Sequence, residues 1–153
     1  METIATEIHN LTVRGITLAD ADSVAELSGQ LGYKASTAEM ISRIRDILPL
    51  RQGHAVFVAC RGDDVIGWIE AEVSRHIQSA PHAMITGLVV KEGVRSLGVG
   101  KRLCAEVEQW SLRQQVSIVR VTSRSTRESA HRFYLREGFT HAKTSLVFEK
   151  VLA

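Results

Sequence analysis

A glycine-rich segment near the middle of the chain has the residue types that suit diphosphate binding. It reads Arg95-x-x-Gly98-x-Gly100, follows an apolar run, and precedes a stretch with the apolar spacing of a helix. The first turn of a helix presents unpaired N–H groups and the positive end of the helix dipole, and glycines let a phosphate approach closely. The spacing therefore indicates an anion site, although a tight strand-to-helix turn would use the same glycines.

The loop departs from the common nucleotide fingerprints. Val99 follows Gly98, where a Walker loop needs Lys followed by Ser or Thr. Leu103 occupies the third glycine position of a dinucleotide fingerprint that begins at Gly98. We therefore expect a phosphate ligand other than a Walker-type or Rossmann-type nucleotide.

The elements that must position this loop alternate along the whole chain. Apolar residues recur with period two in some segments and period 3.6 in others, which is typical of a mixed α/β domain. The predicted strands are Ile8 to Arg14, Ala55 to Cys60, Val65 to Val73, Ala83 to Val90, Ser117 to Thr122, Phe139 to Lys143 and Ser145 to Val151.

Four helices are predicted between these strands from capping residues and apolar spacing. One follows Asp20 or Asp22 and stops near Gly32, one opens at Ser36 or Thr37 and closes at Pro49, one runs from Gly98 or Gly100 to about Gln115, and one spans Glu128 to Glu137 before Gly138.

Composition bounds the class of protein. The chain has 153 residues, 44% hydrophobic and 24% charged, so we expect one folded domain over residues 1–153. The longest uninterrupted apolar run, Ala55 to Cys60, is far shorter than the ~20 residues of a membrane span, and we expect a cytoplasmic location. Cys60 and Cys104 have no metal-ligand spacing, so we expect two buried thiols and no metal.

Positive charge is uneven although the formal net charge is only +2. Arginines crowd the last third of the chain at positions Arg113, Arg120, Arg124, Arg127, Arg132 and Arg136. This asymmetry indicates an anionic ligand near that end, or a solvated face. A nucleic-acid-binding domain would also use such charge, but the chain has no reading motif and only 5% aromatic residues.

A second motif lies downstream of the loop and reads Ala130-His131-Arg132-Phe133-Tyr134-Leu135-Arg136-Glu137-Gly138-Phe139. Together the two segments resemble the coenzyme A loop and the Ala-x-x-x-Tyr-x-x-x-Gly-Phe segment of the GNAT superfamily of acyl-CoA-dependent N-acyltransferases. The wording of the second is similar to aminoalkylphosphonate and aminoglycoside-type small-molecule N-acetyltransferases. The resemblance implies a mixed, mostly antiparallel, twisted sheet of about seven strands with about four helices, splayed between strands four and five.

The resemblance also implies acetyl-CoA as the cosubstrate. Backbone N–H groups would hold its diphosphate, assisted by the charge of Arg95, at Ser96, Leu97, Gly98, Val99, Gly100 and Lys101. The pantetheine would lie along Leu88, Val89 and Val90, pairing with the backbone of Leu88 and Val90 like an added strand. A bulge near Gly87 would open the slot, and the N–H of Val90 would donate to the thioester oxygen.

The implied reaction is direct attack of a primary amine on the thioester in a ternary complex. The resemblance places Tyr134 beside the sulfur, where a phenol with a pKa near ~10 can protonate the leaving thiolate. A core aromatic with a satisfied hydroxyl is the alternative reading of Tyr134.

A base must also remove a proton from the acceptor ammonium. Many relatives carry Glu on the central strand where this chain has Met84, so that role does not transfer. Glu72 and His82 are the candidate catalytic residues, with Glu70, His76 or a chain of waters as alternatives. Solvated glutamates and loop histidines are the competing structural reading.

A second departure from the resemblance follows the fifth predicted strand, where relatives often have Asn and this chain has Arg124. We expect Arg127 to meet the phosphates of coenzyme A, and Arg124 or Arg132 could do the same. Surface solvation of all three is the other possibility.

The function classes that stay open differ in the acceptor and in whether catalysis occurs. We expect a small amine as the acceptor, in a pocket near Tyr33 and Lys143 to Leu146. The alternatives are protein amino termini or lysines, and an inactive module that senses acetyl-CoA. An exposed sheet edge makes a homodimer plausible, and neither nucleic acid nor membrane is expected as a partner.

Overall fold

The computed structural model describes residues 10–30, 32–50, 52–95 and 97–153. The predicted strand start at Ile8 and the predicted cosubstrate contact Ser96 lie outside these residues. The described chain divides after Val121 into two compact units. Each unit is described by itself below.

The first unit is built on a sheet with the strand order β1-β2-β3-β4-β5. Its strands are β1 (Leu11–Gly15), β2 (His54–Arg61), β3 (Asp64–His76), β4 (Ser79–Val90) and β5 (Val119–Val121). The first four pair antiparallel, whereas β5 runs parallel to β4. The prediction of a mixed, mostly antiparallel sheet is confirmed.

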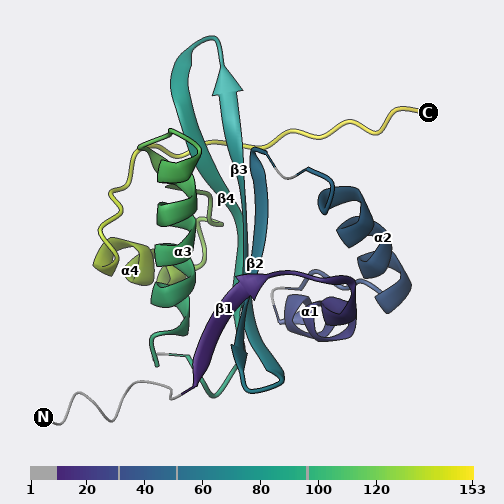
Figure 1. Cartoon of the computed structure of the whole chain (residues 1–153). Helices are drawn as coiled ribbons and strands as arrows, with labels where there is room; N and C mark the ends of the chain where they lie inside the picture. The colour runs from purple at the N-terminus through teal and green to yellow at the C-terminus, as the bar shows by residue number, and fades with distance from the viewer. Residues whose placement is uncertain (1–9, 31, 51, 96) are drawn as a thin grey trace, which may run out of the picture. The chain divides into compact units, whose positions relative to one another are not determined.

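Helices cover both faces of this sheet, with α1 (Ala21–Gly29) and α2 (Thr37–Ile47) on one face and α3 (Val99–Arg113) on the other (Figure 1). A short 3-10 turn, η2 (Leu18–Asp20), leads into α1. Helix α2 begins where the sequence predicts, because the side chain of Ser36 accepts from the Glu39 N–H and the Glu39 carboxylate accepts from the Ser36 N–H.

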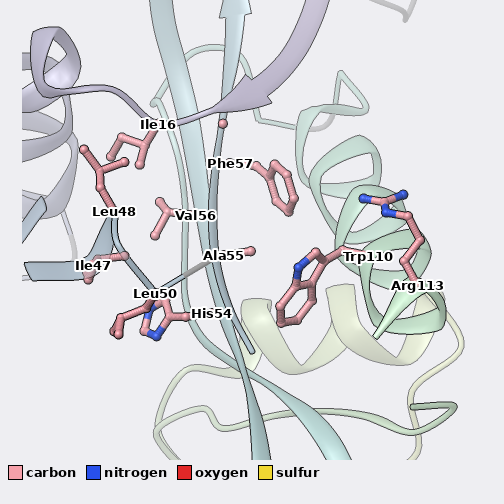
Figure 2. Close-up of a pocket in the computed structure, with 11 residues that line it drawn as sticks. Ile16, Ile47, Leu48, Leu50, His54, Ala55, Val56, Phe57, Trp110 and Arg113 are labelled. Carbon is pink, nitrogen blue, oxygen red and sulfur yellow. The ribbon is translucent and has the colours of Figure 1, made fainter. Parts of the chain in front are cut away.

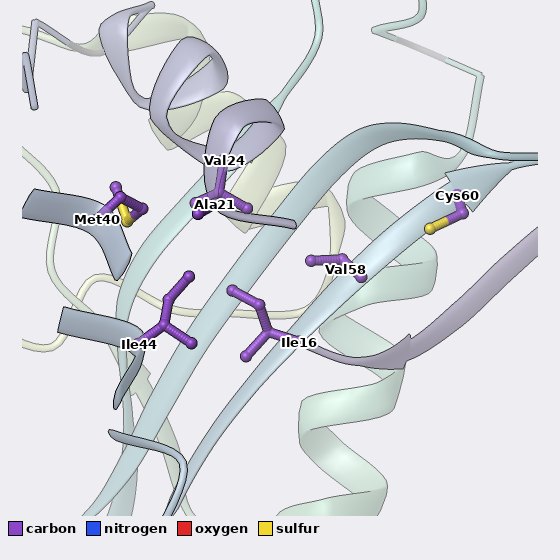
Figure 3. Close-up of a cluster of buried hydrophobic side chains, with 7 residues drawn as sticks. All are labelled: Ile16, Ala21, Val24, Met40, Ile44, Val58 and Cys60. Atoms are coloured by element: carbon purple, nitrogen blue, oxygen red, sulfur yellow. The ribbon is translucent and has the colours of Figure 1, made fainter. Parts of the chain in front are cut away.

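The core on the α1 and α2 face is a cluster of seven buried residues, which Figure 3 shows between the two helices and the sheet. Its members are Ile16, Ala21, Val24, Met40, Ile44, Val58 and Cys60. Trp68 of β3 packs against this cluster. The expected buried thiols are confirmed, since Cys60 and Cys104 are both free and buried, and burial raises the pKa of the Cys60 thiol.

The second unit contains α4 (Glu128–Arg136) and the residues that follow it. The two closing strands predicted at Phe139 to Lys143 and Ser145 to Val151 are wrong, and the sheet has five described strands instead of about seven. A strand exists only where another backbone accepts its hydrogen bonds, and in the described chain no segment pairs with 139–151. An apolar pattern in the sequence indicates which side chains avoid water, but it does not indicate whether a partner strand is present.

Among the described residues, no helix is both long enough and apolar enough to cross a membrane.

Candidate active site

The strand β4 leaves β5 halfway along its length. The two strands pair only from Ala83↔Val119 to Ile85↔Val121. On the other side of β4, Glu70 pairs with Gly87 and Ala71 pairs with Ile85, so Thr86 is one extra residue on β4. This β-bulge lies beside Gly87, as predicted, and it coincides with the end of pairing with β5.

Main-chain groups of Leu88 and Val90 face the side of β4 from which β5 is missing. The N–H of Lys91 donates to the Ile66 carbonyl at 2.8 Å, so Lys91 and, by alternation, Val89 turn their backbone groups toward β3. Leu88 and Val90 therefore turn theirs the other way. This edge suits the addition of an extended ligand by backbone pairing.

At Gly87, the backbone of β4 lies close to the indole ring of Trp68 on β3. A Cβ at Gly87 would lie 2.6 Å from Cη2 and 2.7 Å from Cζ3 of Trp68. The ring can cover the bulged strand only because this residue has no side chain. The indole Nε1 is buried without a hydrogen-bond partner among the described residues.

The helix that follows the loop starts at a glycine in the left-handed conformation. Gly98 is the N-cap of α3, with φ 88° and ψ 3°, and no side chain of a described residue caps the helix. Within the described part of the chain, and leaving out the two neighbours of Gly98 in sequence, no atom lies within 4 Å of the position that a Cβ of Gly98 would occupy. The start of α3 therefore combines the helix dipole with open space, the two conditions that favour an anion there.

Arg95 is held at the end of β4. Its Nε donates to the Val90 carbonyl at 3.2 Å and its Nη2 donates to the Gln30 side chain at 3.3 Å. The guanidinium is thus placed beside the outward-facing edge of β4, and the remaining N–H groups of this exposed side chain can meet an anion.

Two carboxylates and an imidazole meet on the sheet face that carries α1 and α2. Glu70 and Glu72 share the face of Trp68 because side chains alternate along β3. The Nε2 of His54 on β2 donates to Oε2 of Glu70 at 2.7 Å, and its Nδ1 lies 3.9 Å from Oε2 of Glu72. The side chains of His54, Glu70 and Glu72 are 16%, 25% and 46% exposed, so Glu72 is the most accessible.

His54 also lines a pocket of about 280 Å³ at the edge of β2, just beyond the end of β1 (Figure 2). In this view Val56, Ile47 and Leu48 lie on one side of β2, and Trp110 and Arg113 lie on the other. The pocket is mostly apolar, and neither Tyr33 nor Lys143 to Leu146, where we expect the acceptor, contributes to it.

His82 is placed differently from the carboxylates. Its residue is only 2% exposed, and its Nδ1 lies 3.2 Å from the Ala80 carbonyl. The ring packs near that of His76, with a centroid distance of 6.0 Å. His82 is therefore enclosed within the β3–β4 hairpin.

In the second unit, the motif that contains Tyr134 forms the end of α4. The N–H of Phe139 donates to the Tyr134 carbonyl at 3.0 Å, and that of Gly138 donates to the Leu135 carbonyl at 3.3 Å, a Schellman motif. Gly138 has φ 94°, the left-handed value that this motif requires. Tyr134 is 9% exposed, with Phe133 and Phe139 packed edge-on at centroid distances of 5.4 and 5.6 Å.

Arg124, which departs from the resemblance, lies in the loop before α4, and the other two candidate phosphate contacts, Arg127 and Arg132, lie at the N-cap of α4 and within it. The Arg127 N–H donates to the Arg124 carbonyl at 3.0 Å, and Nε2 of His131 lies 2.8 Å from the same oxygen. Arg127 is half-buried as the N-cap of α4, whereas Arg132 is exposed.

Sequence reasoning missed His54. The turn at Arg61 to Asp64 gives a register that would pair His54 with Ala71, but a bulge between Ala59 and Cys60 shifts the pairing by one residue, to Glu72. The period-two pattern of β2 would have placed His54 on the correct face of the sheet only if the position of that bulge had been known.

The sequence model of the acetyltransferase (GNAT) family matches residues 22–139, which include the loop, the bulged strand and the α4 motif. The chain belongs to this family. Its members transfer an acetyl group from acetyl-CoA, so the predictions of an N-acetyltransferase and of its cosubstrate are confirmed.

Individual relatives of this GNAT acetyltransferase act on different small amines. An aminoalkylphosphonate N-acetyltransferase of Salmonella typhimurium is 28% identical over 137 residues, covering 83% of each chain. An aminoglycoside N(6')-acetyltransferase type 1 of Stenotrophomonas maltophilia is 28% identical over 147 residues, covering 92% of this chain and 94% of the relative.

The fold is confirmed by a solved structure. The aminoglycoside N-acetyltransferase AAC(6')-Iy in complex with CoA has a TM-score of 0.82 and 19% identity, covering 92% of this chain and 94% of that one.

Proposed function

We propose that this GNAT enzyme acetylates a primary amine of a small molecule by direct attack within a ternary complex. The observation that carries the proposal is that two features occur together in one strand-loop-helix unit. The backbone edge at Leu88 and Val90 faces away from β3 without pairing to β5, and the uncapped start of α3 at Gly98 follows it.

These features suit the two ends of acetyl-CoA. The pantetheine carries amides that can pair with the backbone of Leu88 and Val90. The diphosphate suits the end of the loop and the first turn of α3, from Leu97 to Lys101. Arg95 supplies positive charge between them, and Arg127 and Ser96 complete the proposed contacts. The N–H of Val90 donates to the thioester oxygen as negative charge develops there.

The acidic face beside the bulge supports a cationic acceptor. Glu70 and Glu72 attract an ammonium group, and His54 holds Glu70 in place through their 2.7 Å hydrogen bond. We assign the base to Glu72, whose side chain is 46% exposed, ahead of His82, whose 2% exposure keeps it from a substrate proton.

The proposed reaction balances without a further reagent. The ammonium loses a proton to Glu72, and the neutral nitrogen attacks the thioester carbon. The C–N bond forms, the C–S bond breaks, and the thiolate of coenzyme A takes a proton from Tyr134. The nitrogen then gives up its second proton through water to the Tyr134 phenolate, and Glu72 releases its proton to solvent. Acetylated amine and free coenzyme A are the products.

The test is calorimetric titration of the ligand-free protein with acetyl-CoA, comparing wild type, Gly98→Asp and Gly62→Asp. Gly62 also has a positive φ, 61°, and open space, so its Asp variant adds the same charge at a comparable backbone position. We expect one-site binding by wild type and Gly62→Asp, and loss of binding by Gly98→Asp because a carboxylate would meet the diphosphate.

Acceptors are then screened by thiol release, with an aminoalkylphosphonate, an aminoglycoside and a lysine peptide as the panel. Release with a small amine supports the proposal. Binding of acetyl-CoA without transfer to any amine would favour the sensor alternative, and transfer to the peptide alone would favour a protein acceptor. Absence of binding by folded wild-type protein would overturn the proposed site.

A further inference from the structure

The pocket at the edge of β2 lies wholly within the first unit and shares only His54 with the proposed acetyl-transfer site. It forms because β2 extends beyond the end of β1. Strand β1 ends at Gly15, which pairs with Phe57, and the Ile16 N–H then donates to the Val56 carbonyl at 3.0 Å. The chain next enters the η2 turn, so no described strand pairs with the first residues of β2 on that side. A hollow of about 280 Å³ remains beside them (Figure 2).

The walls of this pocket are apolar on both faces of β2. Ile47, Leu48 and Leu50 lie on the face that carries α1 and α2, and Trp110 of α3 lies on the other face. Leu48 and Leu50 are 39% and 51% exposed, so apolar surface meets water there. A hydrocarbon ligand between the two walls would remove this surface from water, which is favourable in proportion to its area.

The charge that the pocket offers is positive. No carboxylate belongs to the described residues that line it. Arg113 follows Trp110 by three residues, on the same face of α3, and its exposed guanidinium forms no ion pair with a described residue. The Gln114 side chain accepts from the Gly53 N–H at 3.1 Å, which attaches this end of α3 to the start of β2. A cation with open N–H donors therefore lies beside the apolar walls.

His54 contributes an imidazole ring whose nitrogens face other groups. Its Nε2 donates to Glu70 at 2.7 Å, and its Nδ1 lies 3.9 Å from Oε2 of Glu72. Because both nitrogens lie next to a carboxylate, Arg113 is the side-chain donor that an anion in the pocket would meet. A cationic ligand would meet the like charge of Arg113 instead.

We propose that this pocket is a second binding site, which takes a small apolar carboxylic acid. The carboxylate pairs with the Arg113 guanidinium, which can donate to both of its oxygens, and the hydrocarbon lies along the edge of β2 between Trp110 and the leucines. The volume is near the roughly 300 Å³ lower end of ligand pockets, so the hydrocarbon is a short one. Gly98 and Arg113 lie at opposite ends of α3, about 20 Å apart along the helix. The inference does not depend on acetyl transfer.

Calorimetric titration with hexanoate tests the site, and 1-hexanol is the neutral probe with the same number of carbons. We expect wild type to bind hexanoate at one site, about tenfold more tightly than hexanol, because only the carboxylate pairs with Arg113. Saturating acetyl-CoA and the Gly98→Asp substitution should both leave the hexanoate affinity unchanged, so this result is independent of the proposed cosubstrate site. Equal affinities for the two probes, displacement of hexanoate by acetyl-CoA, or no saturable binding by folded wild type would overturn the proposal.

A pair of charge-matched variants locates the carboxylate. Arg113→Gln removes the cation of the pocket, and Arg43→Gln removes the same charge from the exposed side of α2, outside the pocket. We expect Arg113→Gln to bind hexanoate about tenfold more weakly and no better than hexanol, and Arg43→Gln to bind as wild type does. An unchanged hexanoate affinity in Arg113→Gln, or an equal loss in both variants, contradicts the assignment to Arg113.

A second pair locates the hydrocarbon. Leu50→Glu places a carboxylate on an exposed part of the apolar wall, whereas Ile77→Glu adds the same charge at the turn between β3 and β4, where Ile77 is fully exposed. We expect Leu50→Glu to lose hexanoate binding and Ile77→Glu to retain it, with circular dichroism confirming that both fold. Wild-type affinity in Leu50→Glu would place the ligand elsewhere and refute the site.

Discussion

Substitutions of Glu72 and of His54 should change the rate of acetyl transfer to different extents, because the Glu72 side chain is accessible and the His54 side chain is held against Glu70. Loss of the Glu72 carboxylate leaves the acceptor ammonium to be deprotonated by solvent, so we expect Glu72→Gln to lower kcat by about 10²-fold. His54→Gln frees Glu70 without removing a carboxylate, so its effect on kcat is expected to be smaller.

Steady-state rates over a pH range check this assignment. For Glu72→Gln we expect the rate to rise with pH as the fraction of neutral amine grows, so that the deficit relative to wild type is largest at low pH. Glu108→Gln, an exposed residue of α3, is the matched control and should follow wild type. A wild-type pH profile for Glu72→Gln would remove it from the reaction.

Asp20 stabilises the η2 turn that precedes α1 through a paired, buried carboxylate. It is 4% exposed and accepts two hydrogen bonds of 2.8 Å from the Arg14 guanidinium and one of 2.8 Å from the Thr17 N–H. The hydrogen bonds from Arg14 are the largest cause of a lowered pKa for this carboxyl. We expect Asp20→Asn to reduce the free energy of unfolding by about 2–3 kcal/mol at neutral pH.

The sign of the pH dependence follows from the lowered pKa. A carboxyl whose folded pKa lies below its unfolded value stabilises the fold above the unfolded pKa, and that contribution disappears as the pH falls toward the folded value. Urea unfolding should therefore show the difference between wild type and Asp20→Asn shrinking below about pH 4. Asp46→Asn, on the exposed side of α2, should match wild type throughout; a difference for Asp20→Asn that did not change with pH would refute the argument.

At the scale of elements, two glycines next to helices should respond in opposite ways to alanine. Gly138 has φ 94° in the Schellman motif after α4, whereas Gly29 lies within α1 with nothing within 4 Å of its Cβ position. Gly138→Ala forces a left-handed alanine and is expected to destabilise by about 1–2 kcal/mol.

Gly29→Ala gains helix propensity and should be neutral or stabilising by up to about 1 kcal/mol. Chemical denaturation of both variants checks the pair. A Gly138→Ala protein as stable as wild type would mean that the C-terminal turn of α4, and with it the backbone around Tyr134, is not held by this motif.

Across the whole molecule, positive charge is concentrated in the last third of the chain, although the formal net charge is only +2. Coenzyme A carries several phosphate charges, so its binding should weaken as salt rises. We expect Arg127→Ala to bind acetyl-CoA about tenfold more weakly and with a smaller salt dependence. The exposed Arg43→Ala on α2 is the control for net charge, and equal salt dependence in both variants would place Arg127 outside the site.

Local helix boundaries and family membership can be read from the amino-acid sequence alone. Capping residues such as Ser36 and Glu39 fix the start of α2 through bonds within one turn, and the Tyr134-x-x-x-Gly138-Phe139 spacing is that of a helix C-terminus. These features depend on residues three to five positions apart, so they can be read directly.

Which distant residues come into contact depends on strand pairing, which the sequence pattern did not predict. A one-residue register shift at Ala59/Cys60 places His54 on the face of Glu70 and Glu72. The pairing of β4 with β5 ends at Ile85, next to the bulge at Thr86. Register is set by long-range pairing, and a shift of one residue moves every side chain beyond it to the other face. For the same reason the apolar pattern of 145–151 indicated a strand but could not specify which backbone, if any, would pair with it.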